Sequence, residues 1–150
     1  MKAQPKIEIR EATQRELYSI TAMTRDFFPY TGFTFDTIVE RMQNPDIQYF
    51  VALADGHSVG FVDVEMQTDG SAKILGLAVL KEWRNKGIGK LLLEKALEVA
   101  MENKAKSVVM LVAEDNDIAQ KLYEQSGFKK TGVLNRKLWG KTVLLYSRKL

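Results

Sequence analysis

The sequence predicts an α/β (α+β) fold: one mixed sheet of about six or seven strands with helices on both faces. Three observations lead to this prediction. Short apolar or alternating runs typical of strands recur along the chain. Two neighbouring runs are joined by an amphipathic helical pattern, and such a crossover makes the two strands parallel. An Asp-Gly pair separates two other runs and is typical of an antiparallel hairpin.

The N-terminal half is expected to supply a strand, two helices and a hairpin. Thr13 and Glu16 have the spacing of a capping box, which marks the start of a helix. An aromatic segment, Phe27 to Phe33, ends that helix. The expected elements are the strand 7–10, a helix from 13 to about 25, a helix 36–42 ended by Asn44-Pro45, and hairpin strands 48–54 and 58–67 around Asp55-Gly56.

The C-terminal half is expected to hold the parallel pair and a last hairpin. Asp69-Gly70 turns the chain into the first parallel strand, and Asn116 and Gly127 bound the last helix. The expected elements are the strand 72–80, the helix 88–103, the strand 107–113, a helix from 116 to about 126, and hairpin strands 128–134 and 139–147.

The segment Arg84–Lys90 lies between a strand and a helix and suits phosphate binding. Gly87 and Gly89 let the backbone approach a ligand, and the amides at a helix start favour an anion. A P-loop is excluded, because Arg84 and Leu91 stand where it needs glycine and a hydroxyl residue. A dinucleotide fingerprint fails at Leu92. The remaining pattern is R-x-x-G-x-G, flanked by the cations of Lys81, Arg84, Lys86 and Lys90.

This loop resembles the pyrophosphate loop of the GNAT superfamily of acyl-CoA-dependent N-acyltransferases. The segment from Asn116 to Phe128, N-x-x-A-x-x-L-Y-x-x-x-G-F, is similar to the family's second conserved segment. Specific motifs occupy residues 74–128, and the order of elements fits over the whole chain. The resemblance implies a single N-acetyltransferase domain over residues 1–150.

The resemblance also implies acetyl-CoA as co-substrate, and no metal is expected. The two central parallel strands are expected to splay apart, and the pantetheine arm to enter the gap. The residues expected to contact acetyl-CoA are Leu77, Ala78, Val79, Arg84, Asn85, Lys86, Gly87, Ile88, Gly89, Lys90, Asn116, Ala119 and Tyr123.

Acetyl transfer to an amine needs a neutral amine, donors for the oxyanion and a proton for the leaving thiolate. Tyr123 stands where the family has a tyrosine near the CoA sulfur, so we expect it to donate that proton. The alternative is a packing aromatic. Asn116 caps its helix in either case.

The sequence does not identify which residue acts as the general base. Glu65 is the preferred candidate and Asp63 the next, since both lie on one face of a strand. The exposed side of an antiparallel strand explains them equally well. Many relatives carry a Glu where this chain has Ser71 and Ala72, so Glu114 or an ordered water could serve instead.

The aromatic segment is expected to flank the acceptor, with Phe28, Tyr30 and Phe33 as candidate contacts. The acceptor would be a primary amine of a small molecule, peptide or protein N-terminus, attacking directly in a ternary complex. The alternative is a non-catalytic acyl-CoA-binding or regulatory domain, which Ser71 weakly favours and Tyr123 disfavours.

The composition and charge exclude several kinds of catalytic, binding and membrane-spanning function. The chain has no cysteine and one histidine, which excludes thiolate catalysis and a multi-histidine metal site. The net charge of +3 is spread along the chain, so no nucleic-acid surface is expected. No apolar run approaches the roughly 20 residues that span a bilayer. We expect a cytoplasmic protein without membrane partners, as a monomer or homodimer.

Overall fold

The computed structural model describes residues 4–150 and contains one seven-stranded sheet with the order β1-β2-β3-β4-β5-β7-β6. Neighbouring strands are antiparallel, except that β4 and β5 are parallel. The predicted mixed sheet and its parallel pair are therefore confirmed. The strands are β1 Ile7–Glu11, β2 Ile47–Ala54, β3 His57–Met66, β4 Ala72–Val79, β5 Ser107–Ala113, β6 Lys129–Val133 and β7 Val143–Lys149.

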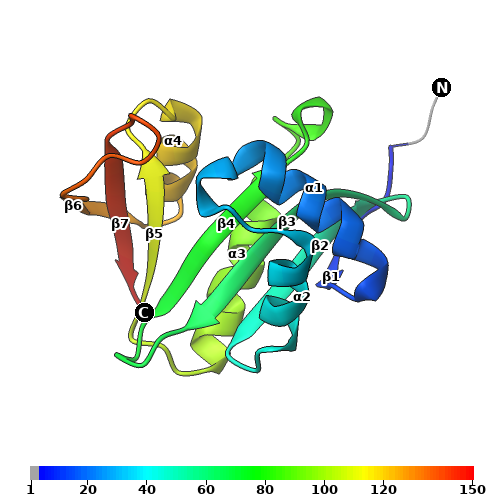
Figure 1. Cartoon of the computed structure of the whole chain (residues 1–150), viewed down its shortest axis with the longest axis horizontal. Coiled ribbons are helices and arrows are strands. Elements are labelled where there is room, and N and C mark those ends of the chain that lie inside the picture. Colours follow the sequence, from blue (N-terminus) through cyan, green and yellow to red (C-terminus); the bar gives the residue numbers. More distant parts are fainter. Residues whose placement is uncertain (1–3) are drawn as a thin grey trace.

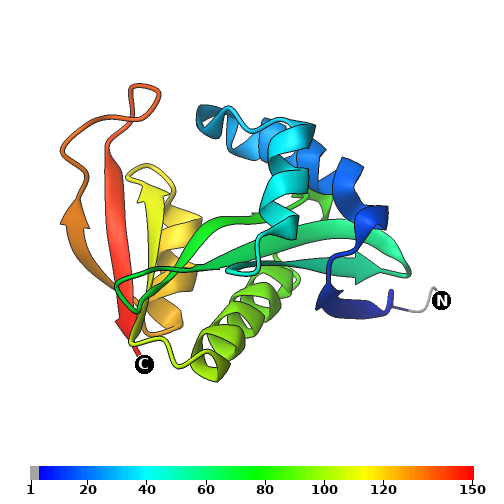
Figure 2. The same ribbon diagram turned by 60° about the horizontal axis from the view of Figure 1, so that its bottom comes forward.

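Helices cover both faces of this sheet, as predicted. Figure 2 shows α1 (Leu17–Phe27) and α2 (Phe35–Gln43) on one side and α3 (Ile88–Glu102) on the other. The fourth helix, α4 (Asp117–Gln125), packs into the same core as α3. Alternation along the strands divides the apolar residues between the two faces: Phe61 packs under α1 and α2, and Val62 packs under α3.

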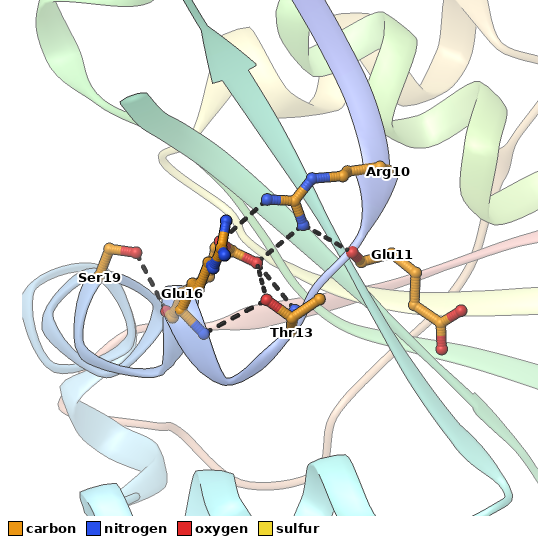
Figure 3. Close-up of polar contacts among 6 residues, drawn as sticks. Arg10, Glu11, Thr13, Glu16 and Ser19 are labelled. Atoms are coloured by element: carbon orange, nitrogen blue, oxygen red, sulfur yellow. Dashed lines mark hydrogen bonds and ion pairs between the residues drawn. The ribbon is translucent and has the colours of Figure 1, made fainter. Parts of the chain in front are cut away.

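An ion pair between the half-buried Arg10 and the buried Glu16 fixes the start of α1 on the sheet (Figure 3). Thr13 and Glu16 form the predicted capping box around a short 3-10 turn, Gln14–Glu16. Arg10 of β1 donates from Nη1 and Nη2 to the two carboxylate oxygens of Glu16, at 2.9 and 3.0 Å. These hydrogen bonds hold the pKa of the buried Glu16 carboxyl below its usual value, ahead of the opposing effect of burial. The first helix is therefore tied to the first strand.

The parallel strands β4 and β5 stay together for only part of their length. They pair from Ala72 with Val108 to Ile74 with Met110, and no further pair follows. β4 remains bonded to β3 as far as Val79, and β5 remains bonded to β7 as far as Ala113. Figure 1 shows the two strands diverging toward their C-terminal ends. The splay expected from the family resemblance is therefore present.

Several strand boundaries differ by one or two residues from the prediction, and the start of the last strand differs by four. The last strand begins at Val143, not at Trp139, because Trp139 (φ 49°) and Gly140 (φ 73°) form a left-handed turn. Backbone hydrogen bonds of 3.0 Å between Leu138 and Lys141 close that turn. β4 ends at Val79, one residue earlier than predicted, since a 3-10 turn follows at Lys81–Trp83.

Candidate functional site

The start of α3 presents backbone amides that have no partner within the helix. Gly87 occupies the N-cap position in a left-handed conformation (φ 80°), and no side chain caps the helix. Asn85 (φ 62°) is also left-handed, so the loop curls in front of the helix. The first-turn amides therefore point out of the helix end, where they and the dipole favour an anion.

Gly87 and Gly89, the two glycines of this loop, have different surroundings. A side chain at Gly87 would meet nothing within 4 Å, so the approach to the helix start is open. A Cβ at Gly89 would lie 3.4 Å from Leu122 Cδ2 and 3.9 Å from the side chains of Leu77 and Val79. These are ordinary contact distances, so a methyl group would fit at Gly89 and the packing of α3 against α4 and β4 does not itself require glycine.

Arg84 folds back onto the end of β4 and the end of α1. Its Nε donates to the carbonyl of Val79 at 3.0 Å, and its guanidinium lies 5.3 Å from the centre of the Phe27 ring. Lys86 and Lys90 are exposed on the loop and the first turn of α3. Positive side chains therefore border the same helix start.

Backbone groups of β4 line the gap. The amide of Leu80 donates to the carbonyl of Val59 at 2.8 Å, so Leu80 faces β3. Alternate residues of a strand direct their amide and carbonyl groups to opposite neighbours. By this alternation Ala78 also faces β3, whereas Leu77 and Val79 face the gap.

The other wall of the gap carries α4. The Asn116 side chain accepts from the amide of Ala119 at 3.1 Å, so the predicted cap is confirmed. Tyr123 is 6% exposed, and its ring lies 6.2 Å from those of Phe128 and Tyr146. Its hydroxyl bonds to none of residues 4–150. All fully enclosed polar side-chain atoms in that range have partners, so the Tyr123 hydroxyl is not completely enclosed.

Tyr30 interacts electrostatically with Asp63 and with Tyr123. Burial, and then the nearby Tyr30, raise the pKa of Tyr123, which therefore keeps its proton at neutral pH. Burial and the charge of Asp63 in turn raise the pKa of Tyr30. Tyr30 thus lies within range of both groups, although the three residues come from α4, β3 and the 3-10 turn Pro29–Thr31. The structure brings together residues that the sequence placed in different candidate sets.

A small cavity of about 10 Å³ lies beneath the segment that joins α1 to α2. Phe28 packs edge-on against Phe61 and Tyr30, with ring centres 6.2 and 6.3 Å apart. Phe28 and Phe33 are partly buried against the core, and Tyr30 is 39% exposed. The lining residues are Thr24, Phe28, Thr31, Phe33, Tyr49, Phe61, Asp63, Leu75 and Gly76.

The two candidate bases of β3 have unlike surroundings. Asp63 is 2% exposed and accepts from Arg41 Nη2 and from the amide of Gly76, both at 2.7 Å. Burial raises the pKa of Asp63 to about 6, although Arg41 and the Gly76 amide oppose this shift. The Glu65 side chain is 32% exposed and lies 3.8 Å from Arg41 Nη1.

The other candidates lie elsewhere, and one important residue was missed. Glu114 is exposed at the end of β5, and Ser71 bonds to Asp69 in the turn before β4. Sequence reasoning did not find Arg41, which resembles any basic residue in the last turn of a short helix. Only the fold brings it to Asp63 and Tyr49.

Two negative findings concern residues 4–150. In that range no three His, Cys, Asp or Glu side chains gather so as to hold a metal ion. No helix of the described chain has the length and apolar character needed to cross a membrane.

The chain is similar in sequence to a known protein family. The sequence model of the family described as "Acetyltransferase (GNAT) family" matches residues 9–128. An N-alpha-acetyltransferase of Saccharolobus solfataricus is 28% identical over 139 residues, covering 84% of this chain and 82% of the relative. Six further curated relatives align over 92 to 95 residues, and the match spans only 30% to 62% of their length.

Solved structures share the fold. Ard1 of Thermoplasma volcanium superposes with a TM-score of 0.85 and 25% identity, over 96% of this chain and 97% of that one. The PaiA N-acetyltransferase of Thermoplasma acidophilum, in complex with coenzyme A, gives 0.79 and 23%, over 97% and 99%. These neighbours confirm the predicted α/β class and its mixed sheet.

The open space at Gly87 leads to a binding prediction. Gly87→Ala places a methyl group where the phosphates would approach, and we expect it to weaken acetyl-CoA binding about 10-fold, or roughly 1.4 kcal/mol. Gly56→Ala is a matched control, since Gly56 has φ 86° and also has open space around it. Both changes carry a similar left-handed strain of about 1–2 kcal/mol. Calorimetry showing equal affinities for the two variants would contradict a ligand at this helix start.

Proposed function

This chain belongs to the acetyltransferase (GNAT) family, and on that premise we propose that it is an N-acetyltransferase. It transfers an acetyl group from acetyl-CoA to a primary amine by direct attack in a ternary complex. The observation that carries the proposal is the gap between β4 and β5. It has an uncapped helix start at one wall, and α4, the helix that carries Tyr123, at the other.

The proposed acetyl-CoA position follows from the polarity of these walls. The pyrophosphate lies at the loop 84–90, against the first-turn amides of α3, with Arg84, Lys86 and Lys90 around it. The pantetheine amides pair with the backbone groups of Leu77 and with the amide of Val79, whose carbonyl accepts from Arg84 Nε. Asn116 and Ala119 border the opposite wall, on α4.

The proposed chemistry needs no covalent intermediate on the protein. The amine attacks the thioester carbonyl, and the tetrahedral intermediate collapses with loss of CoA thiolate. Tyr123 gives this thiolate its proton: burial keeps the phenol protonated at neutral pH, so the proton is present, and the strongly basic thiolate is the group that draws it from this weak acid. A carboxylate of β3, Glu65 or Asp63, takes the proton of the amine.

The proposed acceptor side is the face covered by α1 and α2. The segment 28–34 lies at the same end of the sheet as the β6–β7 loop (Figures 1 and 2). Tyr30 is the most exposed of the three candidate aromatics, while Phe28 and Phe33 shape the cavity beneath it. An apolar wall disfavours an ammonium ion and so favours the neutral, reactive amine. A protein or peptide N-terminus and a small primary amine both fit this description.

A non-catalytic acyl-CoA-binding domain is the second candidate, because Ser71 lies in a turn and no carboxylate stands at the start of β4. An acceptor-panel screen that measures released CoA thiol separates the two. The chain has no cysteine and adds no thiol background. Acetyl-CoA binding without thiol release for any amine would favour the non-catalytic domain.

We also propose that residues 1–150 form one catalytic domain that works in the cytoplasm as a monomer or homodimer. The single sheet to which all the described strands belong supports the first part. Limited proteolysis that yields two separately folded fragments, or cell fractionation that places the protein outside the cytoplasm, would contradict these statements.

Tyr123→Phe tests the proton donor. The change keeps the buried ring, so we expect kcat to fall by about 10²-fold with acetyl-CoA affinity nearly unchanged. Tyr146→Phe is the matched control, because its hydroxyl bonds to Glu124 and Gln120 on the outer side of the core. A Tyr123→Phe variant with the turnover of the Tyr146→Phe control would return Tyr123 to a packing role.

Tyr30→Ala tests the acceptor side. We expect the acceptor KM to rise at least about 3-fold, or the set of accepted amines to change, while acetyl-CoA affinity stays constant. Tyr18→Ala is the control, since Tyr18 is 78% exposed on α1 and stacks on Phe35. Equal acceptor profiles for the two variants would remove Tyr30 from the acceptor site.

A further inference from the structure

We propose that Asp63 is the catalytic residue that accepts the proton of the acceptor amine, and that Arg41 is the positioning residue that holds its carboxylate. The proposal rests on the proposed acetyltransferase function and chooses between the two carboxylates of β3. Four observations support the proposal. They are the register shift between β3 and β4 at Asp63, the glycine at position 76, the contacts of Arg41, and the cavity that Asp63 borders.

Asp63 lies at an irregularity in the sheet beside the gap. The pairing of β3 with β4 shifts register between Val62 and Val64, and Asp63 has no partner on β4, although it pairs with Tyr49 of β2. Its Oδ1 accepts from the amide of Gly76 instead. Gly76 is two residues beyond Ile74, the last residue of β4 that pairs with β5. The carboxylate therefore lies next to the point where the gap opens.

Gly76 keeps the space around this carboxylate free. A Cβ at this position would lie 3.1 Å from Asp63 Oδ1, 3.2 Å from Phe28 Cε2 and 3.3 Å from Phe61 Cε2. All three distances are shorter than ordinary van der Waals contact, so a side chain here would press on the carboxylate. With glycine, Asp63 borders a cavity of about 10 Å³, close to the size that holds one water molecule.

Arg41 reaches Asp63 from α2. Nη2 donates to Asp63 Oδ2 at 2.7 Å, and Nε donates to the Tyr49 hydroxyl at 2.8 Å. The guanidinium lies over the Phe33 ring, 5.1 Å from its centre. These contacts fix one carboxylate oxygen and keep the ionised form available in a buried site, where an unpaired carboxylate would take up a proton.

The proton transfer balances without any further reactant. The bound ammonium gives one proton to the Asp63 carboxylate, directly or through the cavity water, and becomes a neutral amine. The amine forms the C–N bond, the C–S bond breaks, and Tyr123 protonates the leaving thiolate. The amide nitrogen loses its second proton to water, and the phenolate and the carboxylic acid exchange protons with solvent. The net products are the acetylated amine, CoA thiol and one proton.

The surroundings of the two carboxylates favour Asp63 over Glu65 as the base. The charged or titratable groups that face Asp63 are Arg41 from α2, Tyr49 from β2, Glu65 on β3 and Tyr30 from the turn before α2. Glu65 pairs across the strands with Lys73, at the end of β4 where the sheet is still closed. It is 32% exposed and outside the lining of the cavity, whereas Asp63 has a pKa of about 6 and lies within that lining. A base works best when its pKa is near the working pH.

The test is the pH profile of kcat at saturating acceptor, between about pH 5 and 9, for the wild type, Asp63→Asn and Glu65→Gln. A primary amine from the acceptor panel that the wild type acetylates serves as substrate. In the wild type, turnover should rise with pH through an acidic limb near pH 6. Asp63→Asn should lose this limb and at least about 10²-fold in kcat, with acetyl-CoA affinity unchanged. Glu65→Gln should keep the limb.

Arg41→Gln gives a second test that leaves the carboxylate in place. Loss of the nearby positive charge should move the acidic limb to higher pH, and Arg41→Lys should restore part of the shift. An acidic limb that survives in Asp63→Asn, or that disappears in Glu65→Gln, overturns the catalytic role. If Asp63→Asn does not fold, a limb that does not move in Arg41→Gln overturns the proposal. A wild type without turnover on any amine refutes the proposed function itself, and this inference falls with it.

Discussion

The separation of β4 from β5 after three paired residues is the constraint on which the rest of the site depends. Each strand is held by its outer neighbour, β4 by β3 and β5 by β7, so neither can close the gap. Leu77 and Val79 therefore have no backbone partner on β5, and the Val79 carbonyl accepts from Arg84 instead. Buried backbone amides and carbonyls require partners, so a gap of this kind is a place for water or for a ligand with amide groups.

Two arginine–carboxylate pairs hold the first two helices on the sheet, with opposite effects on their acids. Arg10 and the capping box surround Glu16 with donors, so hydrogen bonding dominates and the pKa falls. Asp63 has fewer donors and is buried more deeply, so desolvation dominates and the pKa rises despite Arg41. The first pair is suited to a permanent structural contact. The second leaves a carboxyl group that can change its protonation near neutral pH.

Local signals predicted most of the fold. The Thr13–Glu16 capping box, the Asn116 cap and the strand–helix–strand order from 72 to 113 are each encoded within a short stretch, and the structure has all three. The loop 84–90 was also apparent, because glycines and cations are read directly from the chain. The left-handed turn at Trp139 was missed, since a bulky residue gives no such signal.

Contacts between distant residues could not be predicted in the same way. Alternation placed Asp63 and Glu65 on one face, but it does not say which of them is covered by a helix. That depends on Arg41, which is 22 residues away from Asp63 in sequence. The relation of Tyr30 to Tyr123 likewise exists only in the folded chain. For these reasons the sequence predicted the loop 84–90 in more detail than it predicted the general base.

The most direct measurement is amide hydrogen exchange, residue by residue, with and without acetyl-CoA. If the pantetheine arm lies between β4 and β5, the amides of Leu77 and Val79 gain protection when acetyl-CoA binds. The amide of Ala78, which faces β3, changes little. Acetyl-CoA binding that leaves Leu77 and Val79 as exchangeable as before would contradict the account, because the ligand would then lie outside the gap.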